Sequence, residues 1–139
     1  MLIYRYTIGM RPFDHILYKG NVFTIEWYFD ERGKSAAFEY FEGLTIERQV
    51  KFVKLVRLMG EAGKIFDKTK FRNEGDQIYA FKPQPDRFLC FFFTGRKIIV
   101  TNGFEKKSRK LPPGEKEWAL RAKADFEMRV KNGAYYEKK

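Results

Sequence analysis

The segment from Ile78 to Phe104 contains three short apolar runs separated by turn residues, and this pattern restricts the chain to folds with a sheet at the centre. The runs span 78–82, 87–93 and 98–104, and the two connections are four residues long. Connections this short join antiparallel neighbours. The middle run is nearly all apolar, which is typical of a strand buried on both faces. The sequence therefore predicts an antiparallel sheet with a fully covered central strand.

The first half of the chain predicts one more strand and two helices. Val22–Asp30 alternates between apolar and polar residues, as a half-buried strand does. Ser35 is placed to cap a short helix that extends to about residue 44, and Thr45 to cap a second helix to about residue 61. We expect these helices to form an antiparallel hairpin against the sheet.

The remaining segments complete a small α+β domain. Residues 64–76 are a polar, basic connector, and Leu111-Pro-Pro-Gly114 opens a final helix whose apolar residues recur every fourth position from Trp118 to Val130. The expected order is β-α-α-β-β-β-α, with helices packed on one sheet. We assign residues 21–131 to the domain, 1–20 to an N-terminal extension that could add a strand or a helix, and 132–139 to a tail.

Positive charge is concentrated in the second half of the chain. The formal net charge is +10; residues 1–63 hold 9 Lys/Arg against 8 Asp/Glu, whereas residues 64–139 hold 19 against 10. A local basic field favours an anionic partner, although it can also be a basic surface without a specific partner. The aromatic content of 18% argues against a disordered chain.

Several classes of site are excluded by the residues that the chain lacks. It has no CxxC, HExxH or GxGxxG motif and no P-loop, and its one histidine is His15. We therefore expect no metal and no cofactor. The one cysteine, Cys90, lies within an apolar run, which fits a reducing, cytoplasmic setting. No apolar run is long enough to span a bilayer, so we expect no membrane association.

Lys82 and Arg87 flank the Pro83–Asp86 turn on two antiparallel strands. Counted across the turn, they fall near one edge of the sheet, where two cations repel each other unless an anion lies between them. Cations at fixed spacing on a sheet suit a phosphodiester backbone. The alternative is a pair of solvated charges at the strand ends.

A second group of candidates follows the last strand. Four cations occupy the five positions 106–110, after Asn102, which can hydrogen-bond, and Phe104, on which a base can stack if its ring is not simply part of the core. Lys70 and Arg72 extend this field or are ordinary linker charges. The candidate RNA-binding residues are Lys70, Arg72, Asn102, Phe104, Lys107, Arg109 and Lys110, and the candidate catalytic residues are Lys82, Arg87 and Lys106.

These residue types suit a metal-free cleavage of RNA. In that reaction the 2′-hydroxyl attacks the adjacent phosphate, and the protein must align the attack, move protons and neutralise charge that builds on the phosphate. Lys and Arg perform the last task directly. A Lys whose pKa is depressed by neighbouring cations can also transfer protons.

Residues 22–129 resemble the RelE/HigB-type toxins of bacterial toxin–antitoxin pairs, specifically their phage-related HigB-like branch. The resemblance rests on the order of elements, on the strand pair after Tyr79, and on Gly103-Phe-x-Lys-Lys107 followed by Arg109-Lys-x-Pro112. It implies a RelE-like α+β fold, a ribosome-dependent mRNA endonuclease, and a small helix-turn-helix antitoxin as partner.

The resemblance also implies roles for individual residues. By position, Lys82 and Arg87 match basic residues of the family's concave surface, Lys106 and Lys107 match its basic loop, and Phe104 matches an aromatic position. Two positions depart from the pattern. Many relatives carry a His where this chain has Asn102, and an acidic residue where it has Ala80.

Three other functions are compatible with the sequence. Since Asn102 cannot act as an acid or base, the chain could bind RNA or the ribosome without cleaving it, as an inactive phage-derived protein of the same fold. A gyrase-directed toxin is a second alternative. The basic surface could also serve to bind the antitoxin, a role compatible with both the mRNA-cleaving toxin and the non-catalytic RNA-binding protein.

Overall fold

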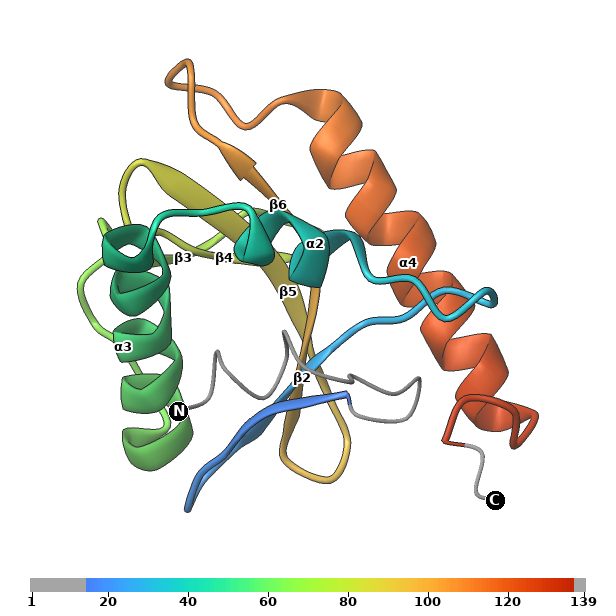
Figure 1. The fold of residues 1–139 in the computed structure, drawn as a ribbon. Coiled ribbons are helices and arrows are strands. Elements are labelled where there is room, and N and C mark those ends of the chain that lie inside the picture. The colour runs from blue at the N-terminus through green and yellow to red at the C-terminus, as the bar shows by residue number, and fades with distance from the viewer. Residues whose placement is uncertain (1–14, 137–139) are drawn as a thin grey trace.

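A six-stranded sheet forms the centre of the molecule, and helices cover both of its faces. The computed structural model describes residues 15–136. In chain order the elements are β1 (Ile16–Lys19), β2 (Thr24–Trp27), α2 (Ala36–Glu42), α3 (Ile46–Ala62), β3 (Phe71–Asn73), β4 (Tyr79–Phe81), β5 (Asp86–Phe93), β6 (Lys97–Glu105) and α4 (Pro113–Lys131). Helices α2 and α3 lie on one face of the sheet and α4 on the other (Figure 1).

Strands from the two halves of the chain meet in the middle of the sheet, where β2 pairs with β6. The strand order is β1-β2-β6-β5-β4-β3, and every neighbouring pair is antiparallel except β2 and β6, which are parallel. The three strands predicted between residues 78 and 104 are present as β4, β5 and β6. The predicted α+β class is confirmed, with a sheet that is mostly antiparallel.

Each face of the sheet has its own apolar core, and β5 contributes to both. Phe88 and Cys90 face α2 and α3, whereas Leu89 and Phe91 face α4. All four side chains are fully buried. The prediction that this strand is covered on both faces is therefore confirmed.

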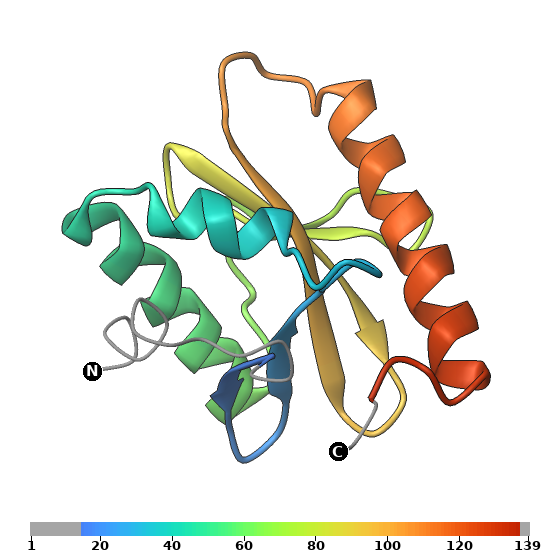
Figure 2. The same ribbon diagram turned by 45° about the vertical axis from the view of Figure 1, so that its right-hand side comes forward.

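The two predicted N-terminal helices begin at the predicted caps. The Ser35 hydroxyl accepts a hydrogen bond from the Phe38 N–H at 3.1 Å, and the Thr45 hydroxyl accepts one from the Arg48 N–H at 3.3 Å. Helix α3 ends at Gly63, whose φ of 82° lies in the left-handed region. Figure 2 shows a short turn joining α2 to α3. In the described part of the chain, no helix is long and apolar enough to cross a bilayer.

Two strands lie in segments that the sequence did not resolve as strands. Ile16–Lys19, within the segment left open as an extension, forms the edge strand β1, and residues 1–14 lie outside the described residues. Phe71–Asn73 forms β3, so the prediction of a connector over residues 64–76 is wrong there. Both strands are so short that no alternation of apolar and polar residues could reveal them.

Strand β2 is buried on both faces, so the prediction of a half-buried strand with one face in solvent is wrong. Glu26 is 2% exposed; its carboxylate accepts a hydrogen bond from the Tyr136 hydroxyl at 2.6 Å and lies 3.4 Å from Lys97 Nζ. The Tyr135 hydroxyl accepts a hydrogen bond from the Phe29 N–H at 3.0 Å. The beginning of the predicted tail therefore packs on the sheet; residues 137–139 are not among those described.

Candidate nucleic-acid interface

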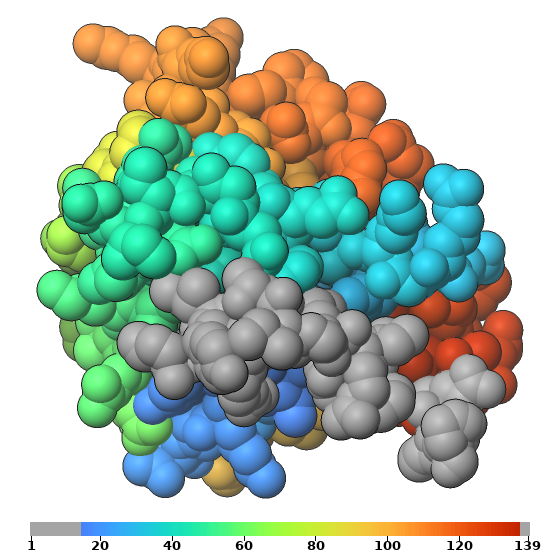
Figure 3. All heavy atoms as spheres, in the orientation of Figure 1, coloured from blue at the N-terminus to red at the C-terminus, as the bar shows by residue number. Residues whose placement is uncertain are grey.

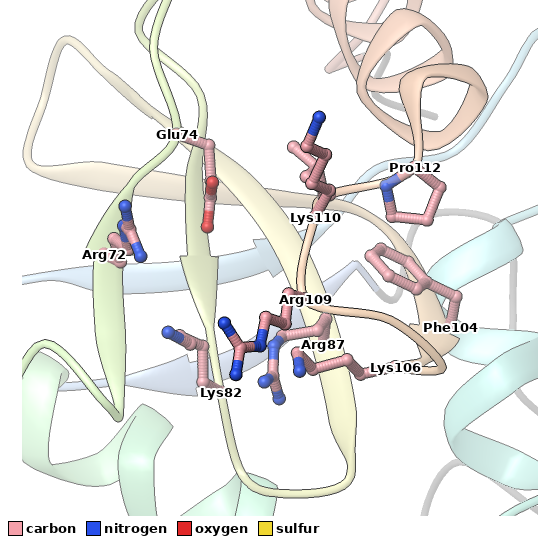
Figure 4. Close-up of a pocket in the computed structure, with 10 residues that line it drawn as sticks. Arg72, Glu74, Lys82, Arg87, Phe104, Lys106, Arg109, Lys110 and Pro112 are labelled. Atoms are coloured by element: carbon pink, nitrogen blue, oxygen red, sulfur yellow. The ribbon is translucent and has the colours of Figure 1, made fainter.

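A basic pocket lies on the α4 side of the sheet, next to the first turn of that helix (Figure 4). Six of its ten lining residues are Lys or Arg, and one is a carboxylate. The lining residues are Arg72, Glu74, Lys82, Arg87, Phe104, Lys106, Arg109, Lys110, Leu111 and Pro112. Its volume of about 40 Å³ is about three times what one ordered water needs, which suits a group the size of a phosphate.

The backbone fixes the three residues predicted to be catalytic. The Lys82 N–H donates to the Lys70 carbonyl at 2.8 Å, and the Lys106 N–H donates to the Pro85 carbonyl at 2.8 Å. Arg87 lies in β5 directly opposite Phe104 in β6. The structure thus brings Lys82, Arg87 and Lys106 from three separate segments to one pocket.

Arg87 is a buried cation without a direct counter-charge. Its side chain is 6% exposed, and one guanidinium nitrogen donates to the Asp86 carbonyl at 2.9 Å and to Gln84 Oε1 at 3.4 Å. Among the described residues, no carboxylate forms an ion pair with Arg87 within 4.0 Å. Burial lowers the pKa of the Arg87 guanidinium. A bound anion would relieve the cost of keeping this charge out of water.

Lys82 faces the same electrostatic problem. Its ammonium donates to the Lys68 carbonyl at 3.1 Å. Burial, and then the charges of Arg87 and Arg72, lower the pKa of the Lys82 ammonium. Cations that the backbone holds together in this way form a preformed binding site for a phosphate.

The loop after β6 supplies three more cations and projects at the top of the molecule, in orange (Figure 3). Lys106, Arg109 and Lys110 line the pocket from this loop. Pro112 immediately precedes α4, so the partial positive charge of the helix N-terminus adds to the field. Lys107 and Lys70, two predicted RNA-binding residues, are exposed but do not line the pocket.

Phe104 lines the pocket but offers no open face for a base. Its side chain is 8% exposed and belongs to the apolar cluster with Ala119 and Ala122 of α4. Its ring therefore forms part of the pocket wall. A base stacked on this ring would have to displace α4.

Asn102 lies outside the pocket, next to an extra residue in β6. Leu89 pairs with Asn102, whereas Cys90 pairs with Val100, so Thr101 is left over. Asn102 is 4% exposed; its Nδ2 donates to Glu115 Oε1 at 2.9 Å, and its Oδ1 accepts from the Thr101 hydroxyl at 2.5 Å. Its amide ties β6 to the first turn of α4, which positions the basic loop.

Glu74 is the charged pocket residue that the sequence analysis missed, together with the apolar Leu111 and Pro112. Arg72 of β3 pairs with Ala80, and Glu74 follows two residues later, so both are directed toward the pocket (Figure 4). Among Phe71, Arg72, Asn73 and Glu74 only the first is apolar, so no alternation marks this segment. The segment was also too short to distinguish a strand from a connector.

The opposite face of the sheet anchors the start of β5. Asp86 is 0% exposed and receives two hydrogen bonds from Arg48 of α3, at 2.9 and 2.6 Å, and another from the Tyr40 hydroxyl. The bond to Asp86 raises the pKa of the Arg48 guanidinium. Asp86 and Arg87 are adjacent and point to opposite faces, so this ion pair holds the backbone that carries Arg87.

A family model described as "Phage derived protein Gp49-like (DUF891)" matches residues 39–124. That region is more than half of the chain. The chain belongs to the Gp49-like family. A search of curated proteins found no match.

The Gp49-like region contains the whole pocket. It begins within α2 and ends within α4, so all ten lining residues fall inside it, as do Arg48 and Asp86. Strands β1 and β2 precede it. The description of the family as phage-derived agrees with the phage-related character expected from the sequence.

Proposed function

We propose that this Gp49-like protein is the toxin of a type II toxin–antitoxin pair, a RelE/HigB-like endonuclease that cleaves mRNA on the ribosome. The observation that carries the proposal is the convergence of Lys82, Arg87 and Lys106 on one phosphate-sized pocket. The resemblance of residues 22–129 to RelE/HigB-type toxins and the phage-derived family support it. The proposal includes a cytoplasmic location and a helix-turn-helix antitoxin that covers the basic pocket.

The pocket provides what a metal-free cleavage requires. The 2′-oxygen attacks the adjacent phosphorus, the bond to the 5′-oxygen breaks, and the products carry a 2′,3′-cyclic phosphate and a 5′-hydroxyl. Negative charge builds on the phosphate during the attack. Lys82, Arg87 and Lys106 stabilise that charge, since the fold already holds them in position.

The charge pattern favours this reaction over two-metal hydrolysis. A two-metal nuclease binds its ions with several carboxylates, whereas the pocket has six cations and one carboxylate. In the part of the chain that the structure describes, no three His, Cys, Asp or Glu side chains are grouped to hold a metal ion.

Induced expression tests the proposal. We expect growth arrest together with new 5′ ends in mRNA at the codon in the ribosomal A site. Lys106→Gln removes a pocket cation and should relieve both effects, whereas Lys107→Gln, which removes an equal charge outside the pocket, should relieve them less. Full growth arrest with intact transcripts would eliminate the nuclease function.

A purified system tests the chemistry. Ribosomes carrying an mRNA with a 2′-deoxy nucleotide at the cleavage position should bind the protein but leave the mRNA whole, because the attacking hydroxyl is missing. Cleavage of that mRNA at the same rate as the all-RNA substrate would contradict the proposed reaction.

A second candidate is a ribosome- or RNA-binding protein without catalytic activity. The observation that favours it is Asn102, whose amide is engaged with Thr101 and Glu115 and which stands where many relatives carry His. Such a protein would sediment with ribosomes and leave mRNA intact. Reversing the charges of Lys106 and Lys107 should then abolish sedimentation.

A further inference from the structure

The proposed reaction needs a group that takes the proton of the attacking 2′-hydroxyl, and the pocket contains one such group. Six lining residues are Lys or Arg, whose side chains are hydrogen-bond donors without an acceptor. Three others, Phe104, Leu111 and Pro112, have no side-chain group that titrates. Glu74 remains, and a carboxylate accepts a proton as it stands.

The backbone that carries Glu74 is fixed from three directions. The Glu74 N–H donates to the Ile78 carbonyl at 2.8 Å, and the Gly75 N–H donates to Asn73 Oδ1 at 2.8 Å. Asp76 forms an ion pair with Lys116 of α4, at 2.8 Å, which attaches the turn to that helix. These contacts attach the turn that carries Glu74 to α4, which begins directly after the basic loop.

The Glu74 carboxylate itself has no ion-pair partner within 4.0 Å among the described residues. Figure 4 shows it directed into the pocket from the side of Arg72. Its charge acts on Lys82 and Arg87, where it opposes the lowering of both pKa values. A carboxylate that merely balanced charge would be expected to sit in direct contact with a cation.

We propose that Glu74 is the general base of this site. The inference rests on the proposed function. Glu74 takes the proton from the 2′-hydroxyl as the 2′-oxygen bonds to phosphorus, and the P–O5′ bond breaks in the same displacement. Lys82 gives a proton to the departing 5′-oxygen. The protonated Glu74 and neutral Lys82 then exchange protons with water.

The assignment of Lys82 as the acid follows from its surroundings. Burial and the neighbouring Arg87 and Arg72 charges lower the pKa of its ammonium, so it gives up a proton more readily than an isolated lysine. The reverse assignment, with Lys82 as the base, requires Lys82 to lose its proton before the reaction. Cleavage would then accelerate steadily as the pH rises toward the pKa of Lys82.

Single-turnover cleavage of mRNA on purified ribosomes tests the proposal, with Glu74→Gln as the variant. Glutamine keeps the shape and the hydrogen-bonding oxygen but accepts no proton. We expect the cleavage rate to fall by about 100-fold or more while the affinity for the ribosome changes little.

Glu117→Gln is the matched control. It removes an exposed carboxylate of α4 that does not line the pocket. We expect its cleavage rate to stay close to that of the wild type, and a loss as large as that of Glu74→Gln would show that loss of any nearby carboxylate slows cleavage and would overturn the inference.

The outcomes separate this inference from the proposed function. If the wild type leaves mRNA whole on the ribosome, the proposed function fails and Glu74 has no reaction to serve. If the wild type cleaves and Glu74→Gln cleaves equally fast, only the inference fails. A Glu74→Gln variant that loses affinity but keeps the maximal rate would also overturn it.

Discussion

The ion pair between Arg48 and Asp86 can be tested by removing only its cation, with Arg48→Met. Methionine keeps most of the length of the side chain and its packing against the sheet. The carboxylate of Asp86, which is 0% exposed, is then left with the Tyr40 hydroxyl and without a counter-charge.

The expected cost follows from the difference in exposure between the two partners. Removing one partner of a fully buried ion pair costs about 3–5 kcal/mol. Arg48 is 29% exposed, so water already screens part of the pair, and we expect the lower end, about 3 kcal/mol. For a chain of 139 residues this corresponds to a fall in Tm of about 10 °C. The reverse change, Asp86→Leu, should cost less, because Arg48 can turn to water or to Glu105, 3.7 Å away.

Urea and thermal unfolding of the two single variants and the double variant give the measurement. The double variant should be more stable than Arg48→Met alone, because the orphaned carboxylate is gone. Lys54→Met, which removes an exposed cation from the same helix, should stay within about 0.5 kcal/mol of the wild type. A cost below about 1 kcal/mol for Arg48→Met would show that the pair behaves like an exposed surface pair, and the reasoning would be refuted.

Three further predictions follow from packing and burial. Gly103→Ala should cost about 1–3 kcal/mol of stability, because the added Cβ would lie 2.7 Å from the Tyr40 ring. Gly114→Ala should not destabilise the chain, because the space around Gly114 is open. Urea unfolding of the two variants gives the comparison. Lys82→Met should raise the stability of the folded state near neutral pH, because the lowered pKa of Lys82 means that the folded state binds its proton less tightly than the unfolded state does. The wild type should regain stability relative to the variant as the pH rises toward the usual pKa of 10.5. A constant difference in stability from pH 7 to 10 would contradict this prediction. Burial raises the pKa of the Cys90 thiol, so an alkylating reagent should modify it only in denaturant, and modification of the native protein would disprove its burial.

The sequence was sufficient where structure is decided by neighbours along the chain. Ser35 and Thr45 cap the helices that follow them because the cap and the helix are a few residues apart. Lys82 and Arg87 reach one pocket because a single short turn sets their separation. The pattern of apolar residues was also enough to predict burial of β5 on both faces.

The sequence was insufficient where distant segments decide the outcome. The parallel pairing of β2 with β6 involves strands about 70 residues apart, and no local pattern encodes it. The extra residue at Thr101 shifts Asn102 toward α4, and that shift depends on the register with β5. Glu74 was missed for a related reason, since β3 is recognisable as a strand only once β4 lies beside it.

The position of β6 between β2 and β5 also has a consequence for the order of folding. Synthesis releases the N-terminal residues first, so β1 and β2 emerge with no neighbour except each other. An isolated two-stranded hairpin is at best marginally stable in water. The sheet closes only after Glu105 has emerged, and the wall formed by residues 106–112 comes later still. The pocket therefore forms only after most of the chain has been synthesised.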